Sequence, residues 1–181
     1  MTALFLSPHN DDETLFGAFT LLRHKPKVLV CLRSDKQENV YGFRVTSSER
    51  EAETDAAMKI LGCEWEQWPF LDSVLDWTMM AEWFTPLSLR HGEIFAPAVE
   101  DGGHEQHNHI GEIADIVFGV DRVTHYMTYT NGRGRSTGVP VPYEREWVAL
   151  KLRALACYES QIRLESTGHH FVQGLEEWYA A

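Results

Sequence analysis

The sequence predicts an α/β protein in which helices cover both faces of a mostly parallel β-sheet. Short apolar runs alternate along the chain with longer stretches whose apolar residues recur every three or four positions. These helical stretches have about ten or more residues, the length that a crossover between two parallel strands requires. No internal repeat or linker-like tract interrupts the pattern, so residues 1–181 are expected to form a single domain.

Five strands are expected, each a short apolar run bounded by polar or turn residues. They cover residues 3–6, 27–32, 63–70, 93–97 and 122–130. If their order in the sheet is 3-2-1-4-5, the first and fourth strands are neighbours where the strand order reverses. Open α/β sheets bind ligands in the crevice beyond the carboxyl ends of the strands at such a point.

Apolar side chains at helical spacing predict the helices between the strands. The first helix, residues 12–24, carries Leu15 and Phe19 on one face, and the second begins near Ser47 and stops at Gly62. The remaining helices are residues 76–90, a helix with Ile110, Ile113, Ala114 and Val117 as its apolar stripe, and residues 144–163.

Composition excludes several classes of partner and location. The chain is 44% hydrophobic, which suffices for one core, and its net charge of -11 makes a nucleic-acid partner unexpected. No apolar stretch is long enough to span a membrane, and residues 1–6 are too short and uncharged for a signal peptide, so none is expected. Cys31, Cys63 and Cys157 form no CxxC pair. We therefore expect a cytoplasmic protein without membrane insertion.

Ionisable side chains cluster in the two loops that should meet at the crevice. Residues 7–13 read Ser-Pro-His-Asn-Asp-Asp-Glu, and residues 102–109 contain three histidines. Ionisable groups packed so closely behind a buried strand are costly to a fold unless a metal or a reaction requires them. The two loops therefore predict a functional site.

The residue types in these loops are those of a catalytic metal site. His9 and Asp12 can turn toward one point, and two imidazoles with one carboxylate leave a coordination position open for water, as in catalytic zinc sites. Asp11 faces a different direction from Asp12, so it would be a free carboxylate beside that water. Glu13 would support the helix start or hold a ligand imidazole. Candidates for the second imidazole are His104, His107 and His109.

Other interpretations of the same residues remain open. The acidic run could cap a helix and the histidines could lie in a solvated loop, although their pairing at one crevice favours a metal. A non-haem Fe(II) oxygenase is an alternative, since His9, Asp11 and a distant histidine form a two-His-one-carboxylate triad. The alternating helices disfavour the jelly roll that this alternative suggests. A metal-free binding relative is a third alternative.

Four motifs occur in an order that resembles one known family. They are Ser7-Pro-His-Asn-Asp-Asp-Glu13; Arg50, Glu53, Ala57 and Leu61-Gly62; Gly103-His-Glu-Gln-His107; and Lys151-Leu-Arg-Ala-Leu-Ala-Cys-Tyr-Glu-Ser-Gln161. Together they resemble the LmbE/PIG-L family of zinc-dependent N-deacetylases. The sequence departs from the family pattern at Pro8, at Asn10 in place of proline, and at Glu-Gln in place of Pro-Asp between the histidines.

This resemblance implies a Rossmann-like three-layer α/β/α sandwich and a metal-dependent hydrolase. The implied reaction removes an acetyl group from the amide nitrogen of an N-acetylated amino sugar or sugar conjugate. His9, Asp12 and His107 would be the ligands of Zn²⁺ or another divalent transition metal. The chain is short for the family, so its pocket is expected to be open or completed by a neighbouring subunit in a homo-oligomer.

The resemblance also implies catalytic roles. Asp11 would be the general base, and a protonated His104 would stabilise the oxyanion. His109 is a rival for the second histidine ligand. Arg50 would reach the substrate, although a solvated arginine at the start of a helix is an equally good interpretation.

Three further features have plain interpretations. Most of the crowded residues Trp65, Trp68, Trp77 and Trp83 are expected to pack in the core or at its rim. The loop of residues 131–142, with Arg133 and Arg135, could be a lid but is better explained as a connection. His169 and His170 are expected at the surface.

Overall fold

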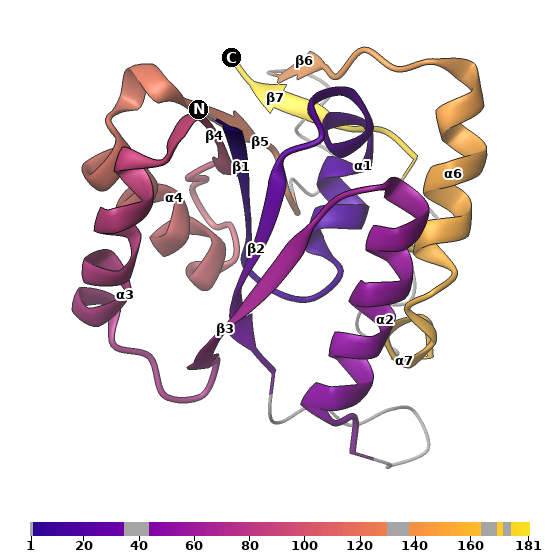
Figure 1. The fold of residues 1–181 in the computed structure, drawn as a ribbon, viewed down its shortest axis with the longest axis horizontal. Coiled ribbons are helices and arrows are strands. Elements are labelled where there is room, and N and C mark those ends of the chain that lie inside the picture. Colours follow the sequence, from indigo (N-terminus) through magenta and orange to yellow (C-terminus); the bar gives the residue numbers. More distant parts are fainter. Residues whose placement is uncertain (1, 35–43, 130–137, 164–169, 172–174) are drawn as a thin grey trace.

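The protein is built around one sheet whose strand order is β3-β2-β1-β4-β5-β7-β6 (Figure 1). A computed structural model describes residues 2–34, 44–129, 138–163, 170–171 and 175–181. The strands in this part of the chain are β1 (Thr2–Ser7), β2 (Lys27–Arg33), β3 (Trp65–Leu71), β4 (His91–Pro97), β5 (Val123–Tyr126), β6 (Gly138–Pro140) and β7 (Trp178–Ala180). β1 to β5 pair in parallel, and β7 pairs antiparallel with β5 and β6.

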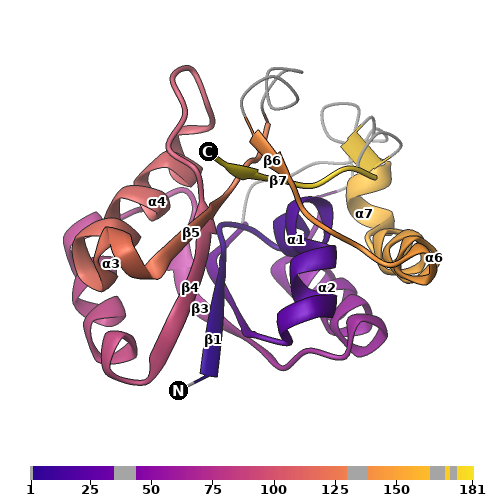
Figure 2. The same cartoon turned by 90° about the horizontal axis from the view of Figure 1, so that it is seen from above.

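Helices cover both faces of this sheet. The described α-helices are α1 (Asp12–His24), α2 (Ser47–Leu61), α3 (Trp77–Phe84), α4 (Glu105–Phe118), α6 (Arg145–Leu155) and α7 (Glu159–Ile162), and the short 3₁₀ helices are η1 (Thr85–Leu89) and η2 (Val120–Arg122). Figures 1 and 2 show α3 and α4 on one face and α1, α2 and α6 on the other. The expected α/β fold, with the order 3-2-1-4-5 in its parallel part, is confirmed.

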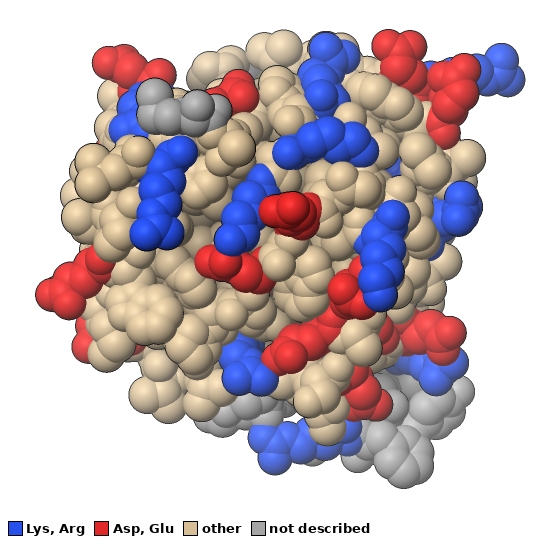
Figure 3. Space-filling model, viewed as in Figure 1, with Lys and Arg blue, Asp and Glu red and all other residues tan. Residues whose placement is uncertain are grey.

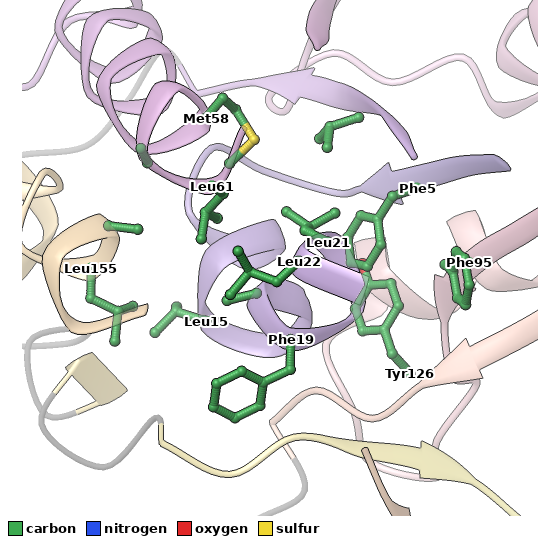
Figure 4. Close-up of a cluster of buried hydrophobic side chains, with 14 of the residues drawn as sticks. Phe5, Leu15, Phe19, Leu21, Leu22, Met58, Leu61, Phe95, Tyr126 and Leu155 are labelled. Carbon is green, nitrogen blue, oxygen red and sulfur yellow. The ribbon is translucent and has the colours of Figure 1, made fainter. Parts of the chain in front are cut away.

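Alternate side chains of the central strands feed two separate cores. Phe5 of β1 packs toward α1, α2 and α6 (Figure 4), whereas Leu4 and Leu6 pack toward α3 and α4. α1 lies so close to β1 that a Cβ atom added at Gly17 would be 2.3 Å from the Phe5 ring. This close packing fixes the start of α1 against the end of β1.

The ends of α2 follow from local sequence signals. Thr46 and Glu49 form a reciprocal capping box at its start, which satisfies two main-chain N–H groups. Gly62 adopts a φ of 68° after its last turn, a left-handed conformation that favours glycine. The sequence predicted both ends of this helix correctly.

The single helix expected over residues 144–163 is wrong, because the chain breaks between α6 and α7. Tyr158 turns inward at the break and its hydroxyl donates to Glu13. The N–H and Oγ of Ser160 both donate to the carboxylate of Glu53, each over 2.7 Å. These contacts with α1 and α2 replace the helical continuation that the apolar spacing indicated.

Other boundaries are shorter than expected. β5 ends at Tyr126 instead of residue 130, and α3 passes into η1 near Pro86, which lacks a main-chain N–H. The three-residue strands β6 and β7 were not expected from the sequence. Most of the glycine-rich loop, with Arg133 and Arg135, lies outside the described residues, as does His169.

The surface carries mixed charges. On the face shown in Figure 3, basic and acidic side chains are interspersed over the helices and strands. Among the described helices, none has the length and apolar composition needed to cross a lipid bilayer.

Candidate metal centre

Three candidate ligand atoms converge where β1 and β4 end. Oδ2 of Asp12 lies 3.1 Å from Nδ1 of His9 and 3.1 Å from Nε2 of His107, and the two imidazole nitrogens are 3.4 Å apart. Ligand atoms of a tetrahedral zinc ion lie roughly 3.3–3.6 Å apart when each is about 2.0–2.2 Å from the metal. The triangle therefore has nearly the dimensions that such an ion requires.

Neighbouring parallel strands bring these ligands together. β1 pairs directly with β4, so the loops that follow them start at the same edge of the sheet. His9 lies in the first of these loops, Asp12 is the first residue of α1, and His107 lies in the first turn of α4. β1 is also the strand at which the order of the sheet reverses, the usual position of a ligand site.

Burial and unpaired atoms also favour a cation here. The side chains of Asp12 and His107 are each 1% exposed. Oδ1 of Asp12, on the carboxylate that would bind the ion, is buried without a hydrogen-bond partner in the described part of the chain; so is Nδ1 of His107, which lies on the other side of its ring from the triangle. Burial alone would raise the pKa of Asp12, but His107 and then His9 outweigh it and hold that pKa well below its usual range. The two nitrogens and one anionic oxygen thus fit a divalent transition metal.

Asp11 stands next to this triangle in an unusual backbone conformation. Its φ of 115° lies in a region that non-glycine residues rarely adopt, and such strain is concentrated at functional sites. Burial raises the pKa of its carboxyl well above the usual value, and the guanidinium of Arg50, 3.2 Å away, opposes this only in part. A buried carboxylate with a raised pKa is a better proton acceptor than an ordinary aspartate.

Arg50 is buried, so it is not the solvated arginine that the sequence also allowed. Its guanidinium contacts Asp11, donates to the carbonyl oxygen of Asn10, and donates to Oγ of Ser34 over 3.0 Å. It also lines the cavity above the ligand triangle. Contact with a substrate stays a prediction, whereas support of the loop that carries Asp11 is a direct observation.

His104 lines the cavity and immediately precedes α4. Its ring centroid is 5.5 Å from that of His9 and 4.7 Å from that of His107. Partial burial, together with the neighbouring imidazoles, lowers its pKa to about 4. The ring is then neutral near pH 7, which disfavours the imidazolium expected from the sequence and leaves a neutral N–H donor.

His109 and Glu13 are engaged elsewhere. The ring of His109 stacks on Trp77 at 4.5 Å, and its Nδ1 lies 2.8 Å from the carbonyl oxygen of Glu105, so it does not join the triangle. Glu13 accepts from the main-chain N–H of Asp11 and from Oγ of Ser7. Glu13 thus supports the loop and the helix start, as expected in part, but contacts no ligand imidazole.

A cavity of about 440 Å³ opens above the triangle and is lined by residues that the sequence did not point to. These residues include Ser34, Asp72, Gln106, Tyr129, Gln161 and His170. His170 was expected at the surface, but it lies on the cavity wall with its ring 4.6 Å from that of Tyr129. Two of them had a sequence signal: Gln106 lies between two candidate histidines, and Gln161 ends the last of the four motifs.

A family of known proteins matches more than half of this chain. Residues 4–118 match the PIG-L family, described as GlcNAc-PI de-N-acetylase. The chain belongs to the PIG-L family. The expected family is therefore confirmed, and membership supports a deacetylase. A sequence search of curated proteins found no match.

Solved structures share the fold of this PIG-L family chain over nearly its whole length. A triple mutant of the deacetylase Orf2 of teicoplanin biosynthesis has a TM-score of 0.81 at 16% identity, over 99% of this chain and 97% of that one. The A40926 pseudoaglycone deacetylase Dbv21 has a TM-score of 0.73 at 14% identity, over 99% and 96%. GalB, a 4-carboxy-2-hydroxymuconate hydratase from Pseudomonas putida KT2440, has a TM-score of 0.66 at 14% identity, over 96% and 84%. The fold thus occurs with more than one reaction.

Proposed function

We propose that this protein is a zinc-dependent hydrolase that removes an acetyl group from the amide nitrogen of an N-acetylated amino sugar or sugar conjugate. The observation that carries the proposal is the triangle of His9, Asp12 and His107 with Asp11 beside it, at the base of a 440 Å³ cavity. Membership in the PIG-L family and the deacetylases among the similar structures support the reaction.

The roles of the residues follow from their positions. A zinc ion held by His9, Asp12 and His107 would lower the pKa of a bound water and polarise the substrate carbonyl. Asp11 accepts the proton of the attacking water, because its buried carboxyl is adjacent and its pKa is raised. Once the C–N bond breaks, Asp11 returns this proton to the departing amine nitrogen.

His104 is positioned to stabilise the charge that develops on the acyl oxygen. It lines the cavity beside His107 and donates an N–H as a neutral imidazole. One such donor typically contributes about 3 kcal/mol to transition-state stabilisation. Arg50 keeps the Asp11 carboxylate oriented toward the cavity through its contact with Oδ2.

The sharpest test replaces the proposed base without removing a metal ligand. Asp11→Asn should retain zinc and lose nearly all acetate release, since an amide cannot accept the proton. The measurement is acetate released from N-acetylglucosamine, from inositol conjugates of it and from chito-oligosaccharides, with and without a chelator. Asp121→Asn, on the exposed η2 turn, is the matched control and should retain wild-type activity.

Two results would contradict the proposal. Undiminished acetate release by Asp11→Asn would remove Asp11 from the role of base. Acetate release by the wild-type protein that persists after complete removal of metal would exclude a metal-dependent reaction altogether.

A further inference from the structure

Gln106 connects the loops that follow β3, β1 and β4. It lies in the first turn of α4, next to His107. Its Nε2 donates to the main-chain carbonyl oxygen of Asp72 over 2.9 Å, and its Oε1 lies 2.6 Å from Nε2 of His9. Asp72 follows β3 directly, and His9 lies just after β1. One side chain therefore joins a candidate ligand beyond β1 to the loop beyond β3, which lies two strands away in the sheet.

The carbonyl oxygen of Asp72 fixes the direction of both hydrogen bonds. A carbonyl oxygen only accepts, so the Gln106 atom that faces it must be the amide nitrogen. The Gln106 atom that faces His9 is then the amide oxygen, which also only accepts. In the neutral imidazole of His9, the hydrogen must therefore be on Nε2 and the lone pair on Nδ1.

This lone pair is directed at the centre of the ligand triangle. Nδ1 of His9 lies 3.1 Å from Oδ2 of Asp12 and 3.4 Å from Nε2 of His107. A lone pair and a carboxylate oxygen at this distance repel each other unless a cation lies between them. The tautomer set by Gln106 is the one in which His9 can bind a metal through Nδ1.

We propose that Gln106 is a positioning residue that holds His9 in the Nε2–H tautomer and so presents Nδ1 to the metal. This inference rests on the metal site of the proposed function. The pattern of donors also explains why an amide stands here. A carboxylate could accept from His9, but it would face the Asp72 carbonyl with an oxygen that has no hydrogen to donate.

The test measures the zinc dissociation constant by competition with a chelator. Gln106→Met keeps the length of the side chain and removes both hydrogen bonds, so the dissociation constant should rise by about 10–100-fold, the usual effect of removing such a partner. Glu105→Met makes a similar change at the exposed neighbouring position and should leave the affinity as in the wild type. An affinity of Gln106→Met within about twofold of the wild type would overturn the inference.

A second measurement needs no variant and so does not depend on whether Gln106→Met folds. Long-range ¹H–¹⁵N spectra of the zinc-loaded wild-type protein should show His9 with its hydrogen on Nε2 and zinc on Nδ1. A hydrogen on Nδ1 would overturn the inference.

These readouts separate the inference from the proposed function because neither uses a substrate. If zinc affinity depends on Gln106 as expected but the protein releases no acetate, only the proposed function is contradicted. Unchanged zinc affinity in an active Gln106→Met protein would contradict the inference alone.

Discussion

Glu13 helps to hold Asp11 in its strained conformation. A residue in a sparsely populated backbone region costs about 1–3 kcal/mol, and the structure around it must supply that energy. Oε2 of Glu13 accepts from the N–H of Asp11 over 3.1 Å and from Oγ of Ser7 over 2.9 Å, while Oε1 accepts from the hydroxyl of Tyr158. Glu13 therefore ties the loop that carries Asp11 to β1 and to the break between α6 and α7.

Replacing this carboxylate should destabilise the protein strongly. Glu13→Ala removes the acceptor of the Asp11 N–H and of the Tyr158 hydroxyl, and one of the two acceptors near Oγ of Ser7, which also lies 2.7 Å from the carbonyl oxygen of His9. At about 1–3 kcal/mol for each buried donor left unpaired, the free energy of unfolding should fall by about 3 kcal/mol or more. Tyr158→Phe removes only one of these bonds and should cost about 1 kcal/mol. Urea denaturation measures both, and equal losses in the two variants would show that Glu13 does not organise the loop.

At the scale of elements, a buried ion pair fixes α1, the helix that begins with the candidate ligand Asp12. Nζ of Lys151 on α6 lies 2.8 Å from Oε1 of Glu177, and both side chains are fully buried. Lys151 also donates to the carbonyl oxygen of Leu15, and Glu177 accepts from the N–H of Phe19. The N–H of Phe19 and the carbonyl oxygen of Leu15, four residues earlier, belong to the same turn of α1. The ion pair therefore contacts both main-chain groups of one helical turn and holds that turn in place.

Removing either charge of this pair alone should lower the free energy of unfolding strongly, whereas removing both charges together should lower it less than the two single losses combined. Lys151→Met or Glu177→Gln alone should lower the free energy of unfolding by about 3–5 kcal/mol, because each leaves an uncompensated buried charge or donor set. The double variant should lose clearly less than the sum. Denaturant titration measures the cycle, and strictly additive losses would contradict a coupled pair.

The surface ion pair of Lys59 and Asp55 supplies a matched control for this cycle. Both side chains are largely exposed and lie one turn apart on α2. Lys59→Met makes the same replacement as Lys151→Met in a solvated setting, where screening and side-chain entropy leave little net stabilisation. Its unfolding midpoint should therefore stay close to that of the wild type.

At the scale of the whole molecule, local patterns predicted the fold well. The periodicity of residues 12–24 and the capping signals around α2 are local, and they placed both helices accurately. The break before α7 depends on Tyr158 meeting Glu13, 145 positions away in the chain. No periodic pattern carries such a contact, so the sequence predicted one continuous helix there.

The candidate site also has features that the sequence could predict and features that it could not. The convergence of His9, Asp12 and His107 could be predicted because each belongs to a motif beside a strand end, and the strand order placed the two motifs together. The position of His170 in the cavity could not be predicted, because it depends on a contact with Tyr129 that is distant in the sequence. The partnership of Gln106 with His9 was also hidden, since it requires the geometry of three loops at once.

Elemental analysis of the purified protein decides whether one divalent metal is held by His9, Asp12 and His107. After dialysis against zinc, the wild-type chain and His109→Ala should each retain about one zinc ion, the number that a three-ligand site holds. Asp12→Ala, verified as folded by circular dichroism, should retain almost none. Equal zinc content in Asp12→Ala and the wild type would show that the metal, if bound, lies elsewhere.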